Sequence, residues 1–321
     1  MPQKIKNITV LMPAYNSAEY IGFAVKSILN QTYKEFEFLI IDDGSTDNTA
    51  EIVNAFNDTR ITYYRVEHKG TAAALNYGLS KASGDWIARI DADDINTSDR
   101  LTKQVDFIEK NPKYNIISSW GVFFNNKCKI LFLLREPVKH SEIYESLDLH
   151  NPLNQSALFF RKNIVKKAKF SEKFTVNEDY ELLYRIRDQA VFYNLPEFLV
   201  FTRVRKISKS FGDRSADSNV FGFLYNNAFK SLLNAKSKGE HYYWSNIIAW
   251  LNFFYGNTNE SRKFFGSAIT LKNTMAYMMT FLPKKMFYKI IDSRIKYRYN
   301  SFFENKKPYY EILKSLTGKI G

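Results

Sequence analysis

The feature that most constrains the fold of this chain is an alternation of short apolar runs and helical segments over its first 96 residues. The apolar runs, each bounded by polar or turn-forming residues, are residues 8–13, 36–41, 61–66 and 86–90. The segments between them that are predicted to be helical are residues 16–29, 46–56 and 70–82, the first with Asn16 or Ser17 as its cap. Strands that alternate with helices at short intervals form right-handed β-α-β units and a parallel sheet. The sequence therefore predicts an α/β fold with a mostly parallel sheet flanked by helices.

Acidic side chains follow two of these predicted strands at the point where each strand ends. Asp91, Asp93 and Asp94 come directly after the fourth apolar run, and Asp43 comes shortly after the second. Because ligands of open parallel sheets bind beyond the carboxyl ends of the strands, we expect these groups to converge at one edge. Neighbouring carboxylates raise one another's pKa unless a cation neutralises them, and their hard oxygens suit Mg²⁺ or Mn²⁺ carrying a phosphate-bearing ligand. The alternative is that these acids only cap the helices that follow.

Cysteine content and hydropathy narrow the expected compartment. Cys128 is the only cysteine, which excludes an intrachain disulfide and argues against a cysteine-based metal site. The first residues lack the apolar core of a signal peptide, and no uninterrupted apolar run has the length of a membrane span. These features favour a soluble protein in the cytoplasm.

The net charge of +13 is concentrated in the last third of the chain. Residues 216–321 contain 16 Lys and Arg against 6 Asp and Glu, which accounts for +10 of the total. Within them, residues 281–299 combine an apolar helical face with many basic and aromatic residues, a pattern that suits an anionic membrane surface. Packing against the rest of the chain or against a second subunit is the alternative. Residues 242–255 leave the same alternatives open, although their bulky aromatics favour burial.

The motifs of this chain resemble those of family 2 glycosyltransferases, the large inverting group with a GT-A fold. The segments that carry the resemblance are Val10–Asn16, Ser27–Thr32, Ile40–Asp47, Ala73–Gly78, Asp91–Asp94, Asp99–Leu101 and Asn177–Arg185. Each motif is weak alone, but their order and spacing over roughly residues 6–212 are specific. The resemblance implies a catalytic domain over 1–213, with a nucleotide-sugar half to about residue 96 and an acceptor half over 97–213. A basic, aromatic-rich helical region is expected over 214–321.

The resemblance also implies roles for individual residues. The residues expected to hold the nucleotide-diphosphate sugar are Pro13, Tyr15, Asp43, Asp91 and Ala92, with Asp43 accepting from a ring N–H of the base. Asp93 is expected to ligate Mn²⁺ or Mg²⁺, with Asp91 as a second candidate ligand. Asp179 is expected to be the catalytic base, because a hydroxyl that attacks the anomeric carbon needs a carboxylate to remove its proton. Asp179 lies at a predicted helix start, where the backbone dipole favours its ionised form.

The chain departs from the family pattern at three places. Arg205 stands where many members have a histidine, and its guanidinium is a candidate contact for the diphosphate. The Gln-x-x-Arg-Trp motif of processive synthases is absent, which predicts transfer of one sugar per acceptor or a short series. His68 stands where an asparagine is common and is given no role, since the four histidines show no ligand spacing.

The predicted function is inverting transfer of one sugar, from a donor expected to be UDP-linked, to a hydroxyl of a saccharide or lipid-linked saccharide. The expected setting is synthesis of lipopolysaccharide, capsule or another cell-surface glycan, with peripheral contact at the inner face of the cell membrane. A homo-oligomer is left open, and no specific nucleic acid is expected. One alternative is a nucleotidyltransferase, which would normally need a glycine-rich basic loop that residues 13–19 lack. The others are an inactive relative or a non-catalytic basic protein that binds nucleic acid or membrane.

Overall fold

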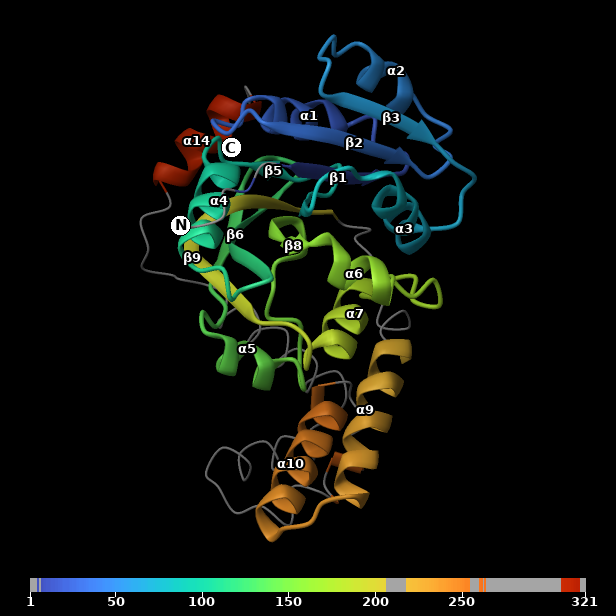
Figure 1. Ribbon diagram of the computed structural model, residues 1–321, viewed down its shortest axis with the longest axis vertical. Helices are drawn as coiled ribbons and strands as arrows, with labels where there is room; N and C mark the ends of the chain where they lie inside the picture. Colours follow the sequence, from blue (N-terminus) through green and yellow to red (C-terminus); the bar gives the residue numbers. More distant parts are fainter. Residues whose placement is uncertain are drawn as a thin grey trace.

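The computed structural model describes Ile5, residues 7–205, 218–254, 260–261, 263 and 307–317. The N-terminal part forms the parallel half of one sheet, in the spatial order β3-β2-β1-β4 (Figure 1). Its strands are β1 (Ile8–Ala14), β2 (Phe36–Asp42), β3 (Ile61–Arg65) and β4 (Trp86–Arg89). The helices between them are α1 (Ile21–Leu29), α2 (Thr49–Asn54) and α3 (Thr71–Lys81). Every pair in this half is parallel, as the alternation of runs predicted.

The second half of the sheet is mixed. Beyond β4 the order continues β8-β6-β9-β5, and β7 pairs with residues 121–124 of β6, beyond the two residues that pair with β8. These strands are β5 (Ile95–Asn96), β6 (Ile116–Asn125), β7 (Ile130–Leu134), β8 (Phe159–Arg161) and β9 (Phe192–Val204). Strand β8 is antiparallel to β4 and β6, whereas β6 and β9 are parallel. The predicted α/β class is confirmed, and parallel pairing dominates only the first half.

The remaining helices of this region are short. They are α4 (Arg100–Lys110), α5 (His140–Ser146), the 3-10 helix η1 (Gln155–Ala157), α6 (Lys162–Ala168) and α7 (Glu178–Ile186). The sequence did not predict β5, α5 or α6, because two to seven residues are too few to establish a periodic pattern. The predicted cap of α1 was wrong: Asn16 has a φ of 45° and its Oδ1 accepts the Thr46 N–H at 2.8 Å. That bond ties the loop after β1 to the loop after β2.

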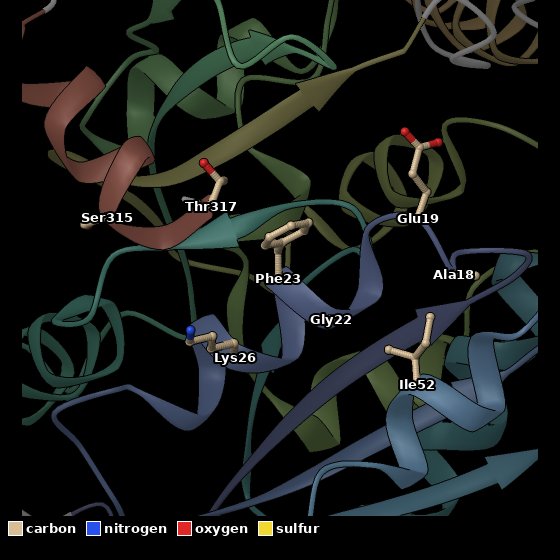
Figure 2. Close-up of a pocket in the computed structure, with 8 residues that line it drawn as sticks. All are labelled: Ala18, Glu19, Gly22, Phe23, Lys26, Ile52, Ser315 and Thr317. Atoms are coloured by element: carbon tan, nitrogen blue, oxygen red, sulfur yellow. The ribbon is translucent and has the colours of Figure 1, made fainter. Parts of the chain in front are cut away.

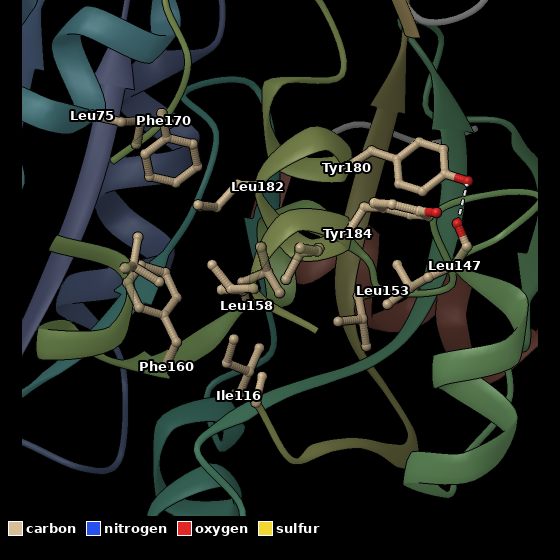
Figure 3. Close-up of a cluster of buried hydrophobic side chains, with 14 of the residues drawn as sticks. Leu75, Ile116, Leu147, Leu153, Leu158, Phe160, Phe170, Tyr180, Leu182 and Tyr184 are labelled. Atoms are coloured by element: carbon tan, nitrogen blue, oxygen red, sulfur yellow. Dashed lines mark hydrogen bonds between the residues drawn. The ribbon is translucent and has the colours of Figure 1, made fainter. Parts of the chain in front are cut away.

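Both faces of β1, β2 and β4 are buried, whereas the edge strand β3 is partly exposed. Leu11, Leu39 and Ile41 pack on the face covered by α3 and α7, while Val10 and Ile40 pack on the face covered by α1 and α4. Burial on both faces explains why these strands appear in the sequence as continuous apolar runs. Figure 3 shows the first cluster, in which α7 is anchored by Leu182 and by Tyr180, whose hydroxyl donates to the Leu147 carbonyl at 2.7 Å.

The described C-terminal helices pack on the rest of the chain (Figure 1). They are α9 (Ser218–Leu233), α10 (Lys238–Phe254) and α14 (Lys307–Thr317). Leu224 of α9 and Ile248 of α10 join the buried cluster that contains α7, so residues 247–249 of the 242–255 segment are buried. Leu313 of α14 is buried against Phe124 and Cys128. The predicted boundary near residue 213 and the basic segment 281–299 lie outside the described residues. Within the described ranges, no helix combines the length and the apolar character needed to cross a bilayer.

Candidate active site

Asp43 directly follows β2, and the loop between β3 and α3 surrounds its carboxylate with hydrogen-bond donors. Asp43 is buried, and its Oδ1 accepts the backbone N–H of Lys69 at 2.8 Å while its Oδ2 accepts that of Gly70 at 2.9 Å. Gly70 has a φ of 94°, a conformation that glycine adopts without strain, and this turn directs the two N–H groups at the carboxylate. By contrast, the neighbouring Asp42 is used within the fold, since its carboxylate accepts from the Tyr63 hydroxyl.

An aromatic pair lies beside Asp43. The His68 ring stacks on the Tyr15 ring with a centroid distance of 4.1 Å and an interplanar angle of 13°. His68 Nδ1 lies 2.8 Å from Asp43 Oδ2, so the carboxylate fixes the histidine ring. Tyr15 is 44% exposed, which leaves part of this aromatic pair open to a ligand. A buried acceptor beside exposed rings suits a flat ligand with N–H groups, such as a nucleobase.

The three carboxylates after β4 have different surroundings. Asp94 is buried, and its Oδ1 accepts the Arg203 N–H at 2.7 Å, which ties the end of β4 to β9. Burial, followed by the neighbouring carboxylates, raises the pKa of Asp94 well above its ordinary value. Asp93 Oδ2 lies 2.8 Å from Arg205 Nε. Burial raises the pKa of Asp93, and the Arg205 guanidinium opposes that rise. Asp91 is the most accessible of the three, with 30% of its side chain exposed.

Two adjacent carboxyls, Glu178 and Asp179, begin α7. They follow Asn177, which has a left-handed backbone conformation with a φ of 58°, and both are at least 95% buried. Burial, and after it the Asp179 charge, raises the pKa of Glu178 to about 7. Burial also raises the pKa of Asp179, against the lowering effect of Arg89. Asn151 Nδ2 donates to Asp179 Oδ2 at 2.7 Å. A positioned carboxyl with a raised pKa is the kind of group that acts as a general base.

Arg89 connects the acids of β4 with those of α7. Its side chain is fully buried, and its Nη2 lies 3.1 Å from Asp91 Oδ1 and 3.5 Å from Glu178 Oε1. A buried cation needs such partners, because an unpaired charge in the interior is very costly. Residues that are 89 positions apart in the chain are thereby joined in one charged cluster.

A second buried arginine, Arg100, bonds to the backbone of Arg89 at the end of β4. Arg100 donates from Nη2 to the carbonyls of Arg89 at 2.8 Å and Leu158 at 3.2 Å, and from Nη1 to Asn96 at 2.6 Å. Burial lowers the pKa of Arg100 to about 9, so its guanidinium stays charged at neutral pH. Arg100 therefore holds the end of β4, where the acidic residues begin.

The accessible acids offer ligands for a divalent metal. The described residues include no group of three or more histidine, cysteine or acidic side chains that could hold a metal ion. However, Mg²⁺ is commonly held by one or two carboxylates together with substrate phosphates. Asp91 and Asp93, two residues apart and both partly exposed, fit that smaller requirement. A metal there would share Asp93 with Arg205.

A separate pocket of about 370 Å³ lies between α1 and α14 (Figure 2). It is lined by Ala18, Glu19, Gly22, Phe23, Lys26, Ile52, Ser315 and Thr317. None of these residues was expected in the site, and the acidic cluster does not line the pocket.

The structure brings the predicted residues together in two groups and reveals further members. In the first group, His68 stacks on Tyr15 and bonds to Asp43. In the second group, Asp91, Asp93 and Arg205 lie around the end of β4. Arg89 of β4 also reaches the acids at the start of α7. Two other residues were predicted to hold the nucleotide sugar. Pro13 lies inside β1, opposite Ile41, and Ala92 is 5% exposed.

The residues that sequence reasoning missed are His68, Arg89, Asn151, Gln155 and Glu178. Arg89 had a usable signal, because a charged residue within an apolar strand must find a partner.

Comparison with known proteins identifies the family of this chain. The profile of Glycosyl transferase family 2 matches residues 9–167. The chain is 30% identical over 210 residues to an uncharacterized glycosyltransferase of Haemophilus influenzae, covering 61% of this chain and 65% of the other. It is 33% identical over 140 residues to the Escherichia coli UDP-Glc:alpha-D-GlcNAc-diphosphoundecaprenol beta-1,3-glucosyltransferase WfgD, covering 43% and 55%. The chain thus spans just under two thirds of the first relative and about half of the second.

Solved structures share the fold across nearly the whole chain. Staphylococcus aureus TarS in complex with UDP-GlcNAc aligns with a TM-score of 0.59 at 18% identity, covering 97% of this chain and 88% of TarS. The mannosyltransferase PcManGT of Pyrobaculum calidifontis, in complex with GDP-Man and Mn²⁺, aligns with a TM-score of 0.57 at 17% identity, covering 92% and 86%. The fold is thus the GT-A fold of glycosyltransferases. With the profile match and the curated relatives, the chain belongs to glycosyltransferase family 2.

Proposed function

We propose that this protein transfers a single sugar, with inversion, from a UDP-sugar to a hydroxyl of a lipid-linked saccharide. The observation that carries the proposal is the arrangement at the carboxyl ends of β2 and β4. An aromatic pair lies beside Asp43 after β2, and the partly exposed carboxylates of Asp91 and Asp93 follow β4. Arg89 of β4 reaches the start of α7, which carries the buried carboxyl of Asp179.

The nucleotide is assigned to the Asp43 end of the site. Tyr15 and His68 provide aromatic surface for the base, and Asp43 provides an acceptor for a ring N–H. UDP is the favoured nucleotide because TarS binds UDP-GlcNAc and WfgD is named for UDP-Glc. The diphosphate would then extend toward Asp91 and Asp93, within reach of Arg205, which already approaches Asp93.

The chemistry assigned to Asp179 is removal of the acceptor's proton. The acceptor oxygen bonds to the anomeric carbon, its proton passes to Asp179, and the bond to the diphosphate breaks with its electron pair leaving on the nucleotide. A single displacement inverts the anomeric centre. A divalent metal held by Asp93 and Asp91 would supply Lewis-acid stabilisation of the charge on the leaving diphosphate. Arg205 supplies a further positive charge on the same side.

The proposed class of acceptor is supported by the similarity to WfgD and by the net positive charge of the last third of the chain. WfgD is named for a diphosphoundecaprenol-linked acceptor, and the basic last third of this chain would favour an anionic membrane surface where such acceptors reside. With such an acceptor, the enzyme would act at the inner face of the cell membrane and would take part in the synthesis of a surface glycan.

The experiment that tests the donor is a thermal-shift screen with UDP, GDP, dTDP and ADP, each with and without Mn²⁺. A ligand at 100 times its Kd stabilises the folded state by about 2.7 kcal/mol, which is a readily measured rise in Tm. We expect the largest rise with UDP and Mn²⁺, and its loss in Asp93→Asn. Asp106→Asn is the matched control, since Asp106 is an exposed carboxylate on α4.

Two outcomes would contradict the proposal. Equal behaviour of Asp93→Asn and Asp106→Asn would remove Asp93 from the site. No stabilisation by any nucleotide at millimolar concentration would contradict the transferase itself. Where UDP binds, NMR of the product formed from a UDP-sugar shows whether the anomeric centre has inverted.

A further inference from the structure

The carboxyl of Asp179 contacts the side-chain amides of one segment, residues 151–155. Asn151 Nδ2 donates to Asp179 Oδ2 at 2.7 Å. Gln155, the first residue of η1, places its amide between Asp179 and the buried guanidinium of Arg89. Both amides lie more than 20 residues before Asp179 in the chain, so tertiary packing brings this segment to the start of α7.

The neighbours of Gln155 determine the orientation of its amide. An amide oxygen facing a carboxylate, with the NH₂ group facing a guanidinium, would place acceptor against acceptor and donor against donor, so the amide would bond to neither neighbour. In the opposite orientation the oxygen accepts from Arg89 Nη1 at 2.6 Å, and the nitrogen donates to Asp179 Oδ2 at 3.1 Å and Oδ1 at 3.3 Å. Gln155 then connects a buried cation to the carboxylate through one planar group.

The two amides do not treat the carboxylate oxygens alike. Asn151 donates to Oδ2 at 2.7 Å, and the Gln155 nitrogen lies 3.1 Å from Oδ2 and 3.3 Å from Oδ1. Hydrogen bonds from amides that are polarised by a buried cation strengthen in a low-dielectric interior. Oδ2 accepts the two shorter bonds and is therefore the weaker base, so Oδ1, which receives the longer bond from Gln155, is the oxygen better able to accept a proton.

We infer that Gln155 is a positioning residue for the base Asp179, and that it acts together with Asn151. Its amide relays the positive charge of Arg89 onto Oδ2, fixes the plane of the carboxylate and directs Oδ1 to the acceptor hydroxyl. The inference rests on the proposed function, because it requires Asp179 to be the base.

The test compares two variants of Gln155 in single-turnover and steady-state sugar transfer from a UDP-sugar. Gln155→Leu removes both hydrogen bonds at similar volume. Gln155→Glu keeps an acceptor for Arg89 but cannot donate to Asp179 and adds a negative charge beside it. We expect both variants to lower kcat by about 10- to 100-fold, the usual effect of losing a group that orients a reacting residue. The Kd for UDP should stay within about twofold, since Gln155 does not touch the proposed nucleotide site.

A matched control separates positioning from folding. Gln104 is also a buried glutamine that joins an arginine to η1: its Oε1 accepts from Arg100 at 3.1 Å and its Nε2 donates to the Ala157 carbonyl at 2.8 Å. Among the residues that the structure describes, the Gln104 side chain bonds to Arg100 and to the Ala157 carbonyl and not to the carboxylate cluster. Gln104→Leu should therefore lower Tm while keeping kcat within about threefold of wild type in the fraction that is folded.

The outcomes distinguish the inference from the proposed function. Gln155→Glu with wild-type kcat would overturn the inference, because a residue that only satisfies Arg89 is replaced well by a carboxylate. Equal losses of kcat in Gln104→Leu and Gln155→Leu would also overturn it and assign a purely structural role. A wild-type protein that binds UDP but transfers no sugar to any acceptor would contradict the proposed function, and the inference would fall with it.

Discussion

Replacing Glu178 by glutamine should stabilise the protein at alkaline pH. Glu178 is 4% exposed beside Asp179, and these surroundings raise its pKa from 4.5 to about 7 despite the Arg89 guanidinium at 3.5 Å. Glutamine has the shape of the protonated acid and can still accept a hydrogen bond from Arg89. The variant therefore removes the charge and keeps the contacts.

The size and sign of the effect follow from proton linkage. Between pH 4.5 and about 7 the folded protein keeps a proton on Glu178 that the unfolded chain has released. The free energy of unfolding of the wild type therefore falls as the pH rises through this window. Each unit of difference between the folded and unfolded pKa contributes about 1.4 kcal/mol, so the loss caused by Glu178 is about 3 kcal/mol at pH 8. At pH 5 the same calculation gives less than about 1 kcal/mol. At each pH, the free energy of unfolding of Glu178→Gln should exceed that of the wild type by the loss calculated for that pH.

The assay is urea unfolding of both proteins at pH 5, 6, 7 and 8, with the free energy of unfolding extrapolated to water. Glu181→Gln is the control, because Glu181 is also a buried carboxylate of α7 but is paired with Arg185 at 2.7 Å. A gain for Glu178→Gln that grows with pH and is absent in the control supports the reasoning. A gain that is the same at pH 5 and pH 8 would refute it, since Glu178 would then titrate equally in the folded and unfolded states.

Three further predictions concern single side chains. Tyr15→Ala should weaken UDP binding by about 1–3 kcal/mol, the usual worth of a base stacked on an aromatic ring, and an unchanged Kd in calorimetry would remove Tyr15 from the base site. Arg205→Ala should also raise the Kd for UDP, because Arg205 lies beside Asp93; unchanged affinity would limit Arg205 to that ion pair. Gly84→Ala should destabilise the fold by about 1–3 kcal/mol, because its Cβ would lie 2.6 Å from the backbone nitrogen of Thr9, and a wild-type Tm would contradict this packing argument.

The structure also explains which sequence predictions were reliable. The helix start predicted at Asp179 is confirmed, since α7 begins at Glu178, and its acidic first turn is a local signal for a helix start. The cap at Asn16 failed for a tertiary reason: its side chain bonds to Thr46, 30 residues further along the chain, rather than to the first turn of α1. A capping preference is a local signal, and a loop partner outside the segment overrode it.

The sequence by itself determined the parallel half of the sheet and the positions of Asp43, Asp91 and Asp93 at strand ends. Those features depend on local patterns: apolar runs fix the strands, and polar residues that follow a run fix where each strand leaves the core. The α/β class and the family resemblance rest on the same local order of motifs.

Only the tertiary structure decided how these groups are connected. Arg89 meets Glu178, and Asn151 and Gln155 meet Asp179, through contacts between segments that no periodicity relates. His68 acquires its place on Tyr15 through the Asp43 carboxylate, and α14 returns to the core of the first 205 residues. Such contacts depend on the way strands and helices pack in three dimensions, and the charge cluster exists because a buried guanidinium must be surrounded by the acids that compensate it.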